Sequence, residues 1–291
     1  MNKVRIKEDI IYNENALTDI TLIHLSDIHF NLYTKEKKLL KIKEMIYLAN
    51  PDYVLITGDL LDTPDIVKNK YKIKELLSFL TSISDRFKVL ISLGNHDVFS
   101  ESDFKFFNKL NDLKNIYILN DDYYKDENIF IGGVTLPNNY YYNITRDESD
   151  KVLVEHLINS KKLVNRLPRN IPKVLMIHSP IRVMDDMVVN KLKDYDLILS
   201  GHTHGGMMPP IMDKIFKGNY GIIAPNKRIA PKVARGRIDK YVNNKKITLI
   251  ISSGITKLSI KSSKLLSKLN FIYNIDINKI IITKKRGKYY E

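Results

Sequence analysis

Short runs of apolar and β-branched residues recur along the chain, and segments with helical spacing lie between several of them. Seven runs predict strands, at 20–25, 53–57, 88–93, 128–134, 173–177, 196–200 and 246–252. Apolar residues at intervals of three or four predict helices over 35–50 and 66–83. This alternation predicts an α/β layered fold, and runs that are apolar at nearly every position indicate sheets covered on both faces.

The C-terminal third departs from this alternation. Residues 205–245 are rich in Gly, Pro, Met and basic residues and predict a long loop or lid, inserted at about 205–245 in a single domain spanning 1–291. Residues 257–270 predict a loop and a short helix packed against the core, with an amphipathic membrane-surface helix as the alternative. Residues 271–283 predict two strands around an Asp-Ile-Asn-Lys turn.

Composition narrows the class of protein. The 291 residues include no cysteine, which excludes a disulfide framework, a thiolate metal site and a cysteine nucleophile. No segment approaches the roughly 18 uninterrupted apolar residues of a membrane-spanning helix, and the first twenty residues do not form a signal peptide. We therefore expect a cytoplasmic protein with no transmembrane segment, leaving peripheral membrane contact open.

The formal net charge of +14 raises the question of an anionic partner. Only ten of the 47 basic residues are arginines, the side chain best suited to bidentate phosphate recognition, and the lysines are scattered. We interpret the charge as a solvated basic surface that attracts anions weakly. Nucleic acid is an open partner but not the favoured one.

Side chains able to bind metal follow five of the predicted strands directly. They are Asp27 and His29, Asp59, Asn95 with His96, His178, and His202 with His204. Ligands of open α/β sheets bind beyond the carboxyl ends of strands, so we expect these side chains to meet at one rim. Asp27 and His29 are two residues apart, and in an extended segment both would point the same way.

A site of Asp, Asn and His without sulfur suits divalent Mn, Fe, Zn or Ni. Seven of these eight residues can serve two ions if one carboxylate bridges them, as in two-metal hydrolases with ions about 3.5–4 Å apart. Glycines 58, 94, 201, 205 and 206 would let the loops turn tightly around the ions. His24 and His156 are predicted to be structural, whereas Asp62 either caps a turn or touches the centre.

The blocks LSDIHF, GDLLD, GNHD, His178 and GHTHGG, in this order, resemble the signature of the calcineurin-like metallophosphoesterase superfamily. The resemblance implies a four-layered α/β/β/α sandwich with two central mixed sheets flanked by helices. It also implies a dinuclear centre in which Asp59 bridges the two ions together with a water or hydroxide. One ion would be bound by Asp27, His29, Asp59 and His204, and the other by Asp59, Asn95, His178 and His202.

The same resemblance implies the chemistry. A metal-bridging hydroxide would attack phosphorus in line, while His96 contacts the scissile phosphate or protonates the leaving group and Asp97 orients His96. GHTHGG and the later SSG at 252–254 most resemble the bacterial phosphodiesterase-like group. We expect a phosphodiesterase or phosphatase acting on a small-molecule or lipid-linked phosphoester, with Mn²⁺ as the first ion to supply in vitro. A nuclease and a non-catalytic scaffold are the alternatives.

Overall fold

The computed structural model describes residues 3–98, 101–141, 146–165, 167–209, 211–212, 218–223, 231–259 and 264–285. Two six-stranded sheets form its centre. The first sheet has the order β1 (Val4–Tyr12), β12 (Ile275–Thr283), β2 (Ile20–Leu25), β3 (Tyr53–Thr57), β4 (Lys88–Ser92), β5 (Ile116–Leu119). Strands β2 to β5 are parallel, and β12 runs antiparallel to β2.

The second sheet is also mixed. Its order is β10 (Gly236–Val242), β11 (Lys245–Ile251), β9 (Leu197–Ser200), β8 (Lys173–Ile177), β7 (Phe130–Val134), β6 (Asp122–Lys125). The four central strands are parallel, and the edge strands β10 and β6 pair antiparallel with their neighbours.

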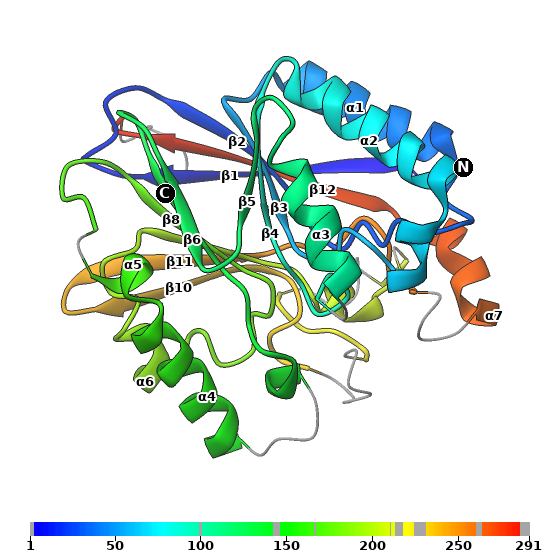
Figure 1. Ribbon diagram of the computed structural model, residues 1–291. Helices are drawn as coiled ribbons and strands as arrows, with labels where there is room; N and C mark the ends of the chain where they lie inside the picture. Colours follow the sequence, from blue (N-terminus) through cyan, green and yellow to red (C-terminus); the bar gives the residue numbers. More distant parts are fainter. Residues whose placement is uncertain are drawn as a thin grey trace.

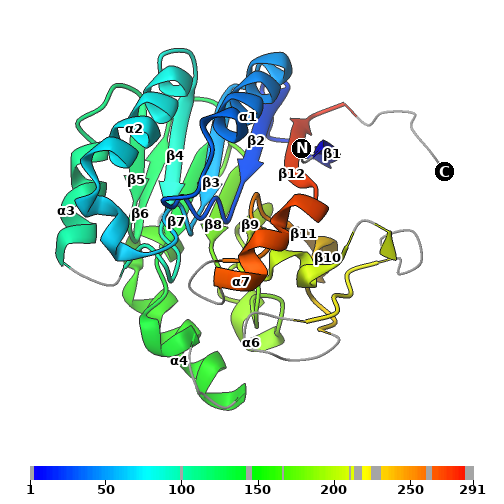
Figure 2. The ribbon, with the colours of Figure 1, turned by 90° about the vertical axis from the view of Figure 1, so that its right-hand side faces the viewer.

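Helices cover the outer face of each sheet, as Figure 1 shows for α1 and α2 above and α4 and α6 below. The first sheet carries α1 (Glu36–Ala49), the 3₁₀ turn η1 (Pro64–Lys68), α2 (Lys70–Ser84) and α3 (Glu101–Leu110). The second carries α4 (Arg146–Asn159), α5 (Lys161–Val164) and α6 (Asp186–Val189). Between these layers, in Figure 2, lies α7 (Lys264–Ser267). The expected four-layered α/β/β/α sandwich is confirmed.

The core explains why the strands are apolar at nearly every position. In β3, Val54 and Ile56 pack toward the helices of the first layer, whereas Leu55 faces the second sheet. From that sheet, Val174 and Met176 of β8 belong to the same inter-sheet core as Leu55. Both faces of each central strand are therefore buried, which removes the polar alternation of a one-sided sheet.

The last strand departs from the sequence-based expectation. Residues 275–283 form the single strand β12 instead of two strands around a turn. Asp276 is buried inside it, where Arg5 Nε donates to Oδ1 at 2.7 Å and Lys257 Nζ donates to Oδ2 at 3.1 Å. Because these partners from distant segments neutralise the carboxylate, Asp276 acts as a strand residue and not as a turn signal.

Two further expectations change. Residues 236–242 form β10, so the predicted lid is shorter at its C-terminal end, and residues 210, 213–217 and 224–230 of that prediction lie outside the described residues. The short helix expected near 257–270 exists as α7, followed by the 3₁₀ turn η5 (Lys268–Ile272). Two of the apolar side chains described in this segment do not pack on the core, since Leu265 of α7 is 73% and Phe271 of η5 is 66% exposed. No helix within the described ranges is both long and apolar enough to cross a membrane.

Candidate metal centre

The candidate metal centre lies where the carboxyl ends of strands from both sheets meet. Strands β2, β3 and β4 of the first sheet and β8 and β9 of the second precede its residues. Hydrogen bonds join the two sheets here: the Nδ1 atom of His178 lies 2.8 Å from the Thr57 carbonyl, and the Ile255 amide donates to the Ser26 carbonyl at 2.9 Å. The expected single rim is therefore built from two sheets.

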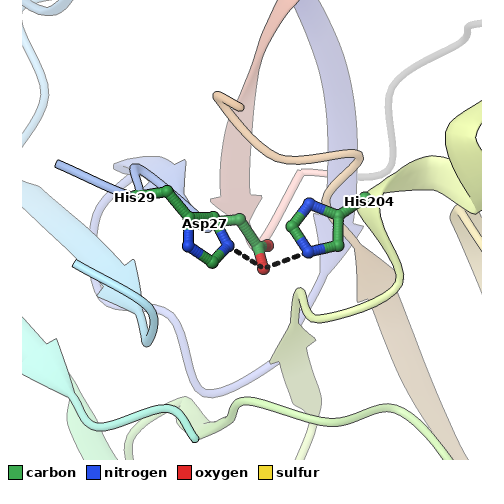
Figure 3. Close-up of side chains that lie close together, drawn as sticks. All are labelled: Asp27, His29 and His204. Carbon is green, nitrogen blue, oxygen red and sulfur yellow. Dashed lines mark ion pairs between the residues drawn. The ribbon is translucent and has the colours of Figure 1, made fainter. Parts of the chain in front are cut away.

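One group of ligand atoms is formed by Asp27, His29 and His204. Oδ1 of Asp27 lies 3.9 Å from Nε2 of His29 and 3.7 Å from Nε2 of His204. Figure 3 shows this carboxylate oxygen between the two imidazoles, whose rings stack with centroids 5.0 Å apart. Their ligand atoms lie within 4.8 Å of one another, close enough to share one ion.

The second group is formed by Asp59, His178 and His202. Oδ2 of Asp59 lies 3.2 Å from Nε2 of His178, and the rings of His178 and His202 have centroids 5.1 Å apart. The three ligand atoms again lie within 4.8 Å of one another. Asn95, expected as a further ligand, follows β4 and has a buried Oδ1 atom.

Asp59 connects the two groups. Its Oδ2 atom also lies 3.5 Å from Nε2 of His29, which belongs to the first group. Its other oxygen, Oδ1, accepts a hydrogen bond from the His96 amide at 2.8 Å. One oxygen of Asp59 is thus held by the backbone while the other faces both groups, the arrangement that a bridging carboxylate requires.

Buried polar atoms that lack a hydrogen-bond partner indicate that these residues are arranged to bind metal ions. Buried atoms without a hydrogen-bond partner among the described residues include four candidate ligand atoms: His29 Nε2, Asp59 Oδ2, Asn95 Oδ1 and His178 Nε2. A buried polar atom without a partner costs about 1–3 kcal/mol. All four are atoms that divalent Mn, Fe, Zn or Ni accept as ligands, so two ions would satisfy them together.

Backbone carbonyls set the orientation of two imidazoles. Nδ1 of His178 lies 2.8 Å from the Thr57 carbonyl, and Nδ1 of His204 lies 2.8 Å from the Thr256 carbonyl. A carbonyl only accepts, so Nδ1 carries the proton in both rings. In the neutral ring the lone pair is then on Nε2, the atom that faces Asp59 in His178 and Asp27 in His204.

Five of the ligand residues have left-handed backbone conformations. Their φ angles lie between 47° and 64°, for His29, His204, Asp59, Asp27 and His202 in ascending order. The expectation that Asp27 and His29 point the same way because the segment is extended is therefore wrong. Such conformations cost of order 1–3 kcal/mol each and cluster at functional sites, where surrounding contacts hold them. Here the Asp27 amide donates to the Gly58 carbonyl at 3.1 Å.

Two of the expected glycines are required by close approach of the loops. A Cβ atom on Gly94 would lie 2.3 Å from Oδ1 of Asp59. A Cβ atom on Gly201 would lie 1.6 Å from Oγ of Ser26, which itself donates to Oδ2 of Asp27 at 2.6 Å. Any side chain at either glycine would push a metal-binding carboxylate out of place.

The charges of the centre are mutually dependent. Burial alone would raise the pKa of Asp59, but the imidazole of His178 and its neighbours outweigh it and lower the pKa well below the usual range. Burial alone would lower the pKa of His178, but the Asp59 carboxylate raises it to about 9. Burial lowers the pKa of His202 to about 3, with the charge of His178 adding to the effect. At pH 7 Asp59 is therefore ionised and His202 neutral, whereas His178 carries an Nε2 proton that a bound ion would displace.

The Asp97 carboxylate does not hold the His96 ring, as was expected, but accepts hydrogen bonds from the backbone. It accepts them from the backbone amides of Gly94 and Leu61, both at 3.0 Å, and so braces the loops after β3 and β4. The ring of His96 is held instead by the Asp62 carbonyl, 2.6 Å from its Nδ1 atom. The family resemblance implied Asp97 as the orienting group, but the loop turns the two side chains toward different partners.

Asp62 proves to touch the centre. Its Oδ1 atom lies 3.4 Å from Nδ1 of His29 and accepts a hydrogen bond from Oγ of Ser259. The second Asp of GDLLD was its only sequence signal, and nothing in the pattern pointed to Ser259. His24 and His156 lie elsewhere, as expected for structural residues: their Nε2 atoms contact Thr57 Oγ1 at 2.8 Å and Asp121 Oδ1 at 2.9 Å.

With this geometry established, comparison with known proteins assigns the class. The chain belongs to the calcineurin-like phosphoesterase family, whose profile matches residues 20–206. The matched range contains all the clustered Asp and His side chains described above.

The sequence identity to individual relatives is low. The chain is 27% identical to an uncharacterized metallophosphoesterase of Campylobacter jejuni over 68% of this chain and 47% of the relative. It is 24% identical to the uncharacterized metallophosphoesterase YkuE of Bacillus subtilis over 69% of this chain and 64% of that protein. It is 25% identical to a transmembrane protein with a metallophosphoesterase domain from Danio rerio, over 71% of this chain and 46% of that protein. The chain spans about half the length of most of these curated relatives.

Among solved structures, a dimetal phosphatase from Danio rerio resembles the fold with a TM-score of 0.42 and 10% identity, covering 81% of this chain and 87% of that chain. A nuclease from Pseudomonas putida aligns with a TM-score of 0.34 and 11% identity, over 80% of this chain and 74% of that chain.

Proposed function

We propose that the protein is a metal-dependent phosphoester hydrolase that uses two divalent ions. The observation that carries this proposal is the unpartnered Oδ2 atom of Asp59, 3.5 Å from Nε2 of His29 and 3.2 Å from Nε2 of His178. When bound, two ions would lower the pKa of a coordinated water toward neutrality and offset charge on the phosphoryl group during in-line attack. Mn²⁺ is the ion we expect to support activity in vitro.

His96 is our candidate for the proton donor. Its ring lies edge-on to His29, with centroids 4.6 Å apart, so it stands beside the first group of ligands. The Asp62 carbonyl holds the ring, and the Asp62 carboxylate lies 3.8 Å from Nδ1. A histidine so placed can donate a proton to the departing alkoxide.

The first experiment is hydrolysis of paired chromogenic phosphate monoesters and diesters by metal-stripped protein, with and without added Mn²⁺. Turnover that depends on Mn²⁺ supports the proposal, and the ratio of diester to monoester rates assigns phosphodiesterase or phosphatase. Failure of the protein to bind any divalent ion would refute it. The variant Asp59→Asn serves as the inactive reference.

A cavity beside the centre supports an anionic substrate. Its volume is about 720 Å³, and Thr256, whose carbonyl holds His204, forms part of its wall. Asn31, which donates to the His29 carbonyl at 2.9 Å, is also part of the wall. The wall is rich in lysines, namely Lys35, Lys37, Lys38, Lys41 and Lys268.

An exposed apolar side chain, Phe271, forms part of the same wall. Leu265, Leu269 and Ile272, in the same segment of α7 and η5, are also exposed. Lysines beside exposed apolar side chains fit an anionic amphiphile, because the headgroup meets cations and the acyl chains meet apolar surface. This combination supports a lipid-linked phosphoester over a fully polar substrate, together with peripheral membrane contact.

Vesicle co-sedimentation tests this substrate class. We expect the protein to bind vesicles containing phosphatidylglycerol and not vesicles of phosphatidylcholine alone. The double variant Leu265→Ser, Phe271→Ser should lose most of the binding, whereas Tyr241→Ser, which changes an equally exposed side chain on β10, should not. Equal binding by all three proteins would contradict the assignment.

The net charge of +14 keeps a nuclease as the second candidate function. Contacts to a nucleic-acid backbone weaken steeply with added salt, so cleavage of a DNA oligonucleotide that collapses between 50 and 200 mM salt would favour it. Hydrolysis of a chromogenic diester, which carries one charge, would depend only weakly on the salt concentration. The cytoplasmic location expected from the sequence stays a prediction.

A further inference from the structure

Tyr141 lies beside the second group of ligands, although no sequence motif marks it. It ends the 3₁₀ turn η2 (Asn138–Tyr141), which follows β7, the neighbour of β8 in the second sheet. Its ring centroid lies 5.1 Å from that of His202 and 6.2 Å from that of His178. Its hydroxyl is buried and has no hydrogen-bond partner among the residues that the structure describes.

The turn that carries Tyr141 is held on both sides of the centre. Nδ2 of Asn138 donates to the Val98 carbonyl at 3.2 Å, in the loop that also carries His96. The hydroxyl of Tyr140 donates to the Ile181 carbonyl, in the loop that follows His178. Neighbours of Tyr141 are thus tied to both loops, so its ring is positioned before any ligand arrives.

The Tyr141 hydroxyl is protonated at neutral pH, because the ordinary pKa of a tyrosine is about 10. A protonated hydroxyl can donate a hydrogen bond, and a buried donor without an acceptor costs free energy. The centre is built to receive a phosphoryl group, whose oxygens are strong acceptors.

We propose that Tyr141 is a further catalytic residue, whose hydroxyl donates a hydrogen bond to a non-bridging oxygen of the phosphoryl group held beside His178 and His202. This inference rests on the proposed phosphoester hydrolase function. It places one donor at each end of the centre, because His96 stands against His29 and Tyr141 stands against His202. His96 serves the leaving oxygen, and Tyr141 serves an oxygen that stays on phosphorus.

Calorimetric titration of Mn²⁺-loaded protein with inorganic phosphate tests the assignment, with Tyr141→Phe as the variant. Loss of one hydrogen bond to a charged group should weaken phosphate binding by about 10- to 100-fold. Mn²⁺ stoichiometry should not change. The melting temperature of the metal-free variant should not fall, because the hydroxyl that is removed has no partner among the described residues.

The matched control is Tyr195→Phe. Tyr195 is also buried, but its hydroxyl donates to the Leu163 carbonyl at 2.7 Å, so this variant should lose thermal stability and keep phosphate affinity. Unchanged phosphate affinity in Tyr141→Phe would overturn the inference, as would loss of Mn²⁺ or a lower melting temperature in that variant. Wild-type protein that binds Mn²⁺ but no phosphate would overturn the proposed function, and this inference with it.

Discussion

Oδ2 of Asp59 lies 3.2 Å from Nε2 of His178, although the two residues follow strands of different sheets. Asp59 comes after β3 and His178 after β8, and the Thr57 carbonyl at the end of β3 accepts from the His178 ring. The candidate bridging site therefore exists only when the two sheets are packed together. Formation of the centre is coupled to the packing of the inter-sheet core.

Replacement of the bridging carboxylate should remove the centre. In Asp59→Asn, the amide nitrogen cannot serve as a ligand, so the affinity for the two ions should fall by at least about 100-fold, the upper end for losses at the partners of ligands. Activity should fall with it. Calorimetry with Mn²⁺ measures the loss, and Asp65→Asn, an exposed carboxylate after the same strand, is the control. Two tightly bound ions in Asp59→Asn would contradict the bridging role.

The hydroxyl of Ser26 should matter for metal affinity although it is not a ligand. It donates to Oδ2 of Asp27 at 2.6 Å and to the Thr57 carbonyl at 3.0 Å, which orients the carboxylate. Ser26→Ala should lower Mn²⁺ affinity by about 10- to 100-fold. Ser92→Ala is the matched control, because the buried Ser92 hydroxyl at the end of β4 has no partner in the described part of the chain. Equal affinities in the two variants would argue against orientation by Ser26.

Loss of His96 should impair chemistry and spare metal binding. We expect His96→Asn to lower kcat by about 10²- to 10⁴-fold, the range for a general acid, while two Mn²⁺ ions still bind. The loss should be largest for esters with a poor leaving group, because 4-nitrophenolate departs without a proton. The kcat values of wild type and His96→Asn, measured over a series of esters with different leaving groups, test this expectation. The same loss for every ester would assign His96 to phosphate binding instead.

Acid should remove the contribution of the Asp126 carboxylate to the stability of the folded protein. Burial alone would raise the pKa of Asp126, but hydrogen bonds from Tyr53, Lys88 and other donors lower it to about 2, below the usual 3.8. Between these values the unfolded chain holds more protons than the folded protein, so this stabilisation is present above pH 4 and is lost as the pH falls through 2. After allowance for solvent screening it amounts to about 1 kcal/mol.

Urea unfolding of wild type and Asp126→Asn at several pH values measures this contribution. The difference in the free energy of unfolding should be constant above about pH 5 and shrink toward pH 2. A difference that does not change with pH would show that Asp126 contributes by packing alone.

Much of the fold was predictable because the central strands are buried on both faces. All seven predicted runs form strands, and α1 matches its predicted range, whereas the helix predicted over 66–83 is divided into η1 and α2, which begins at Lys70. Strands β1, β5, β6 and β10 were not predicted. In β1, charged residues such as Lys7 and Asp9 interrupt the apolar positions, and the strand is defined by its pairing with β12, from the opposite end of the chain.

The sequence by itself determined the candidate metal ligands, because each directly follows an apolar run that predicts a buried strand. Tertiary structure decided how they meet. The left-handed conformations of Asp27 and His29, and the exchange of Asp97 for the Asp62 carbonyl beside His96, depend on loops closing against one another. Tyr141 reaches His202 only because β7 lies beside β8. Strand periodicity is a local property, whereas these contacts join residues far apart in the chain and are set by the packing of two sheets.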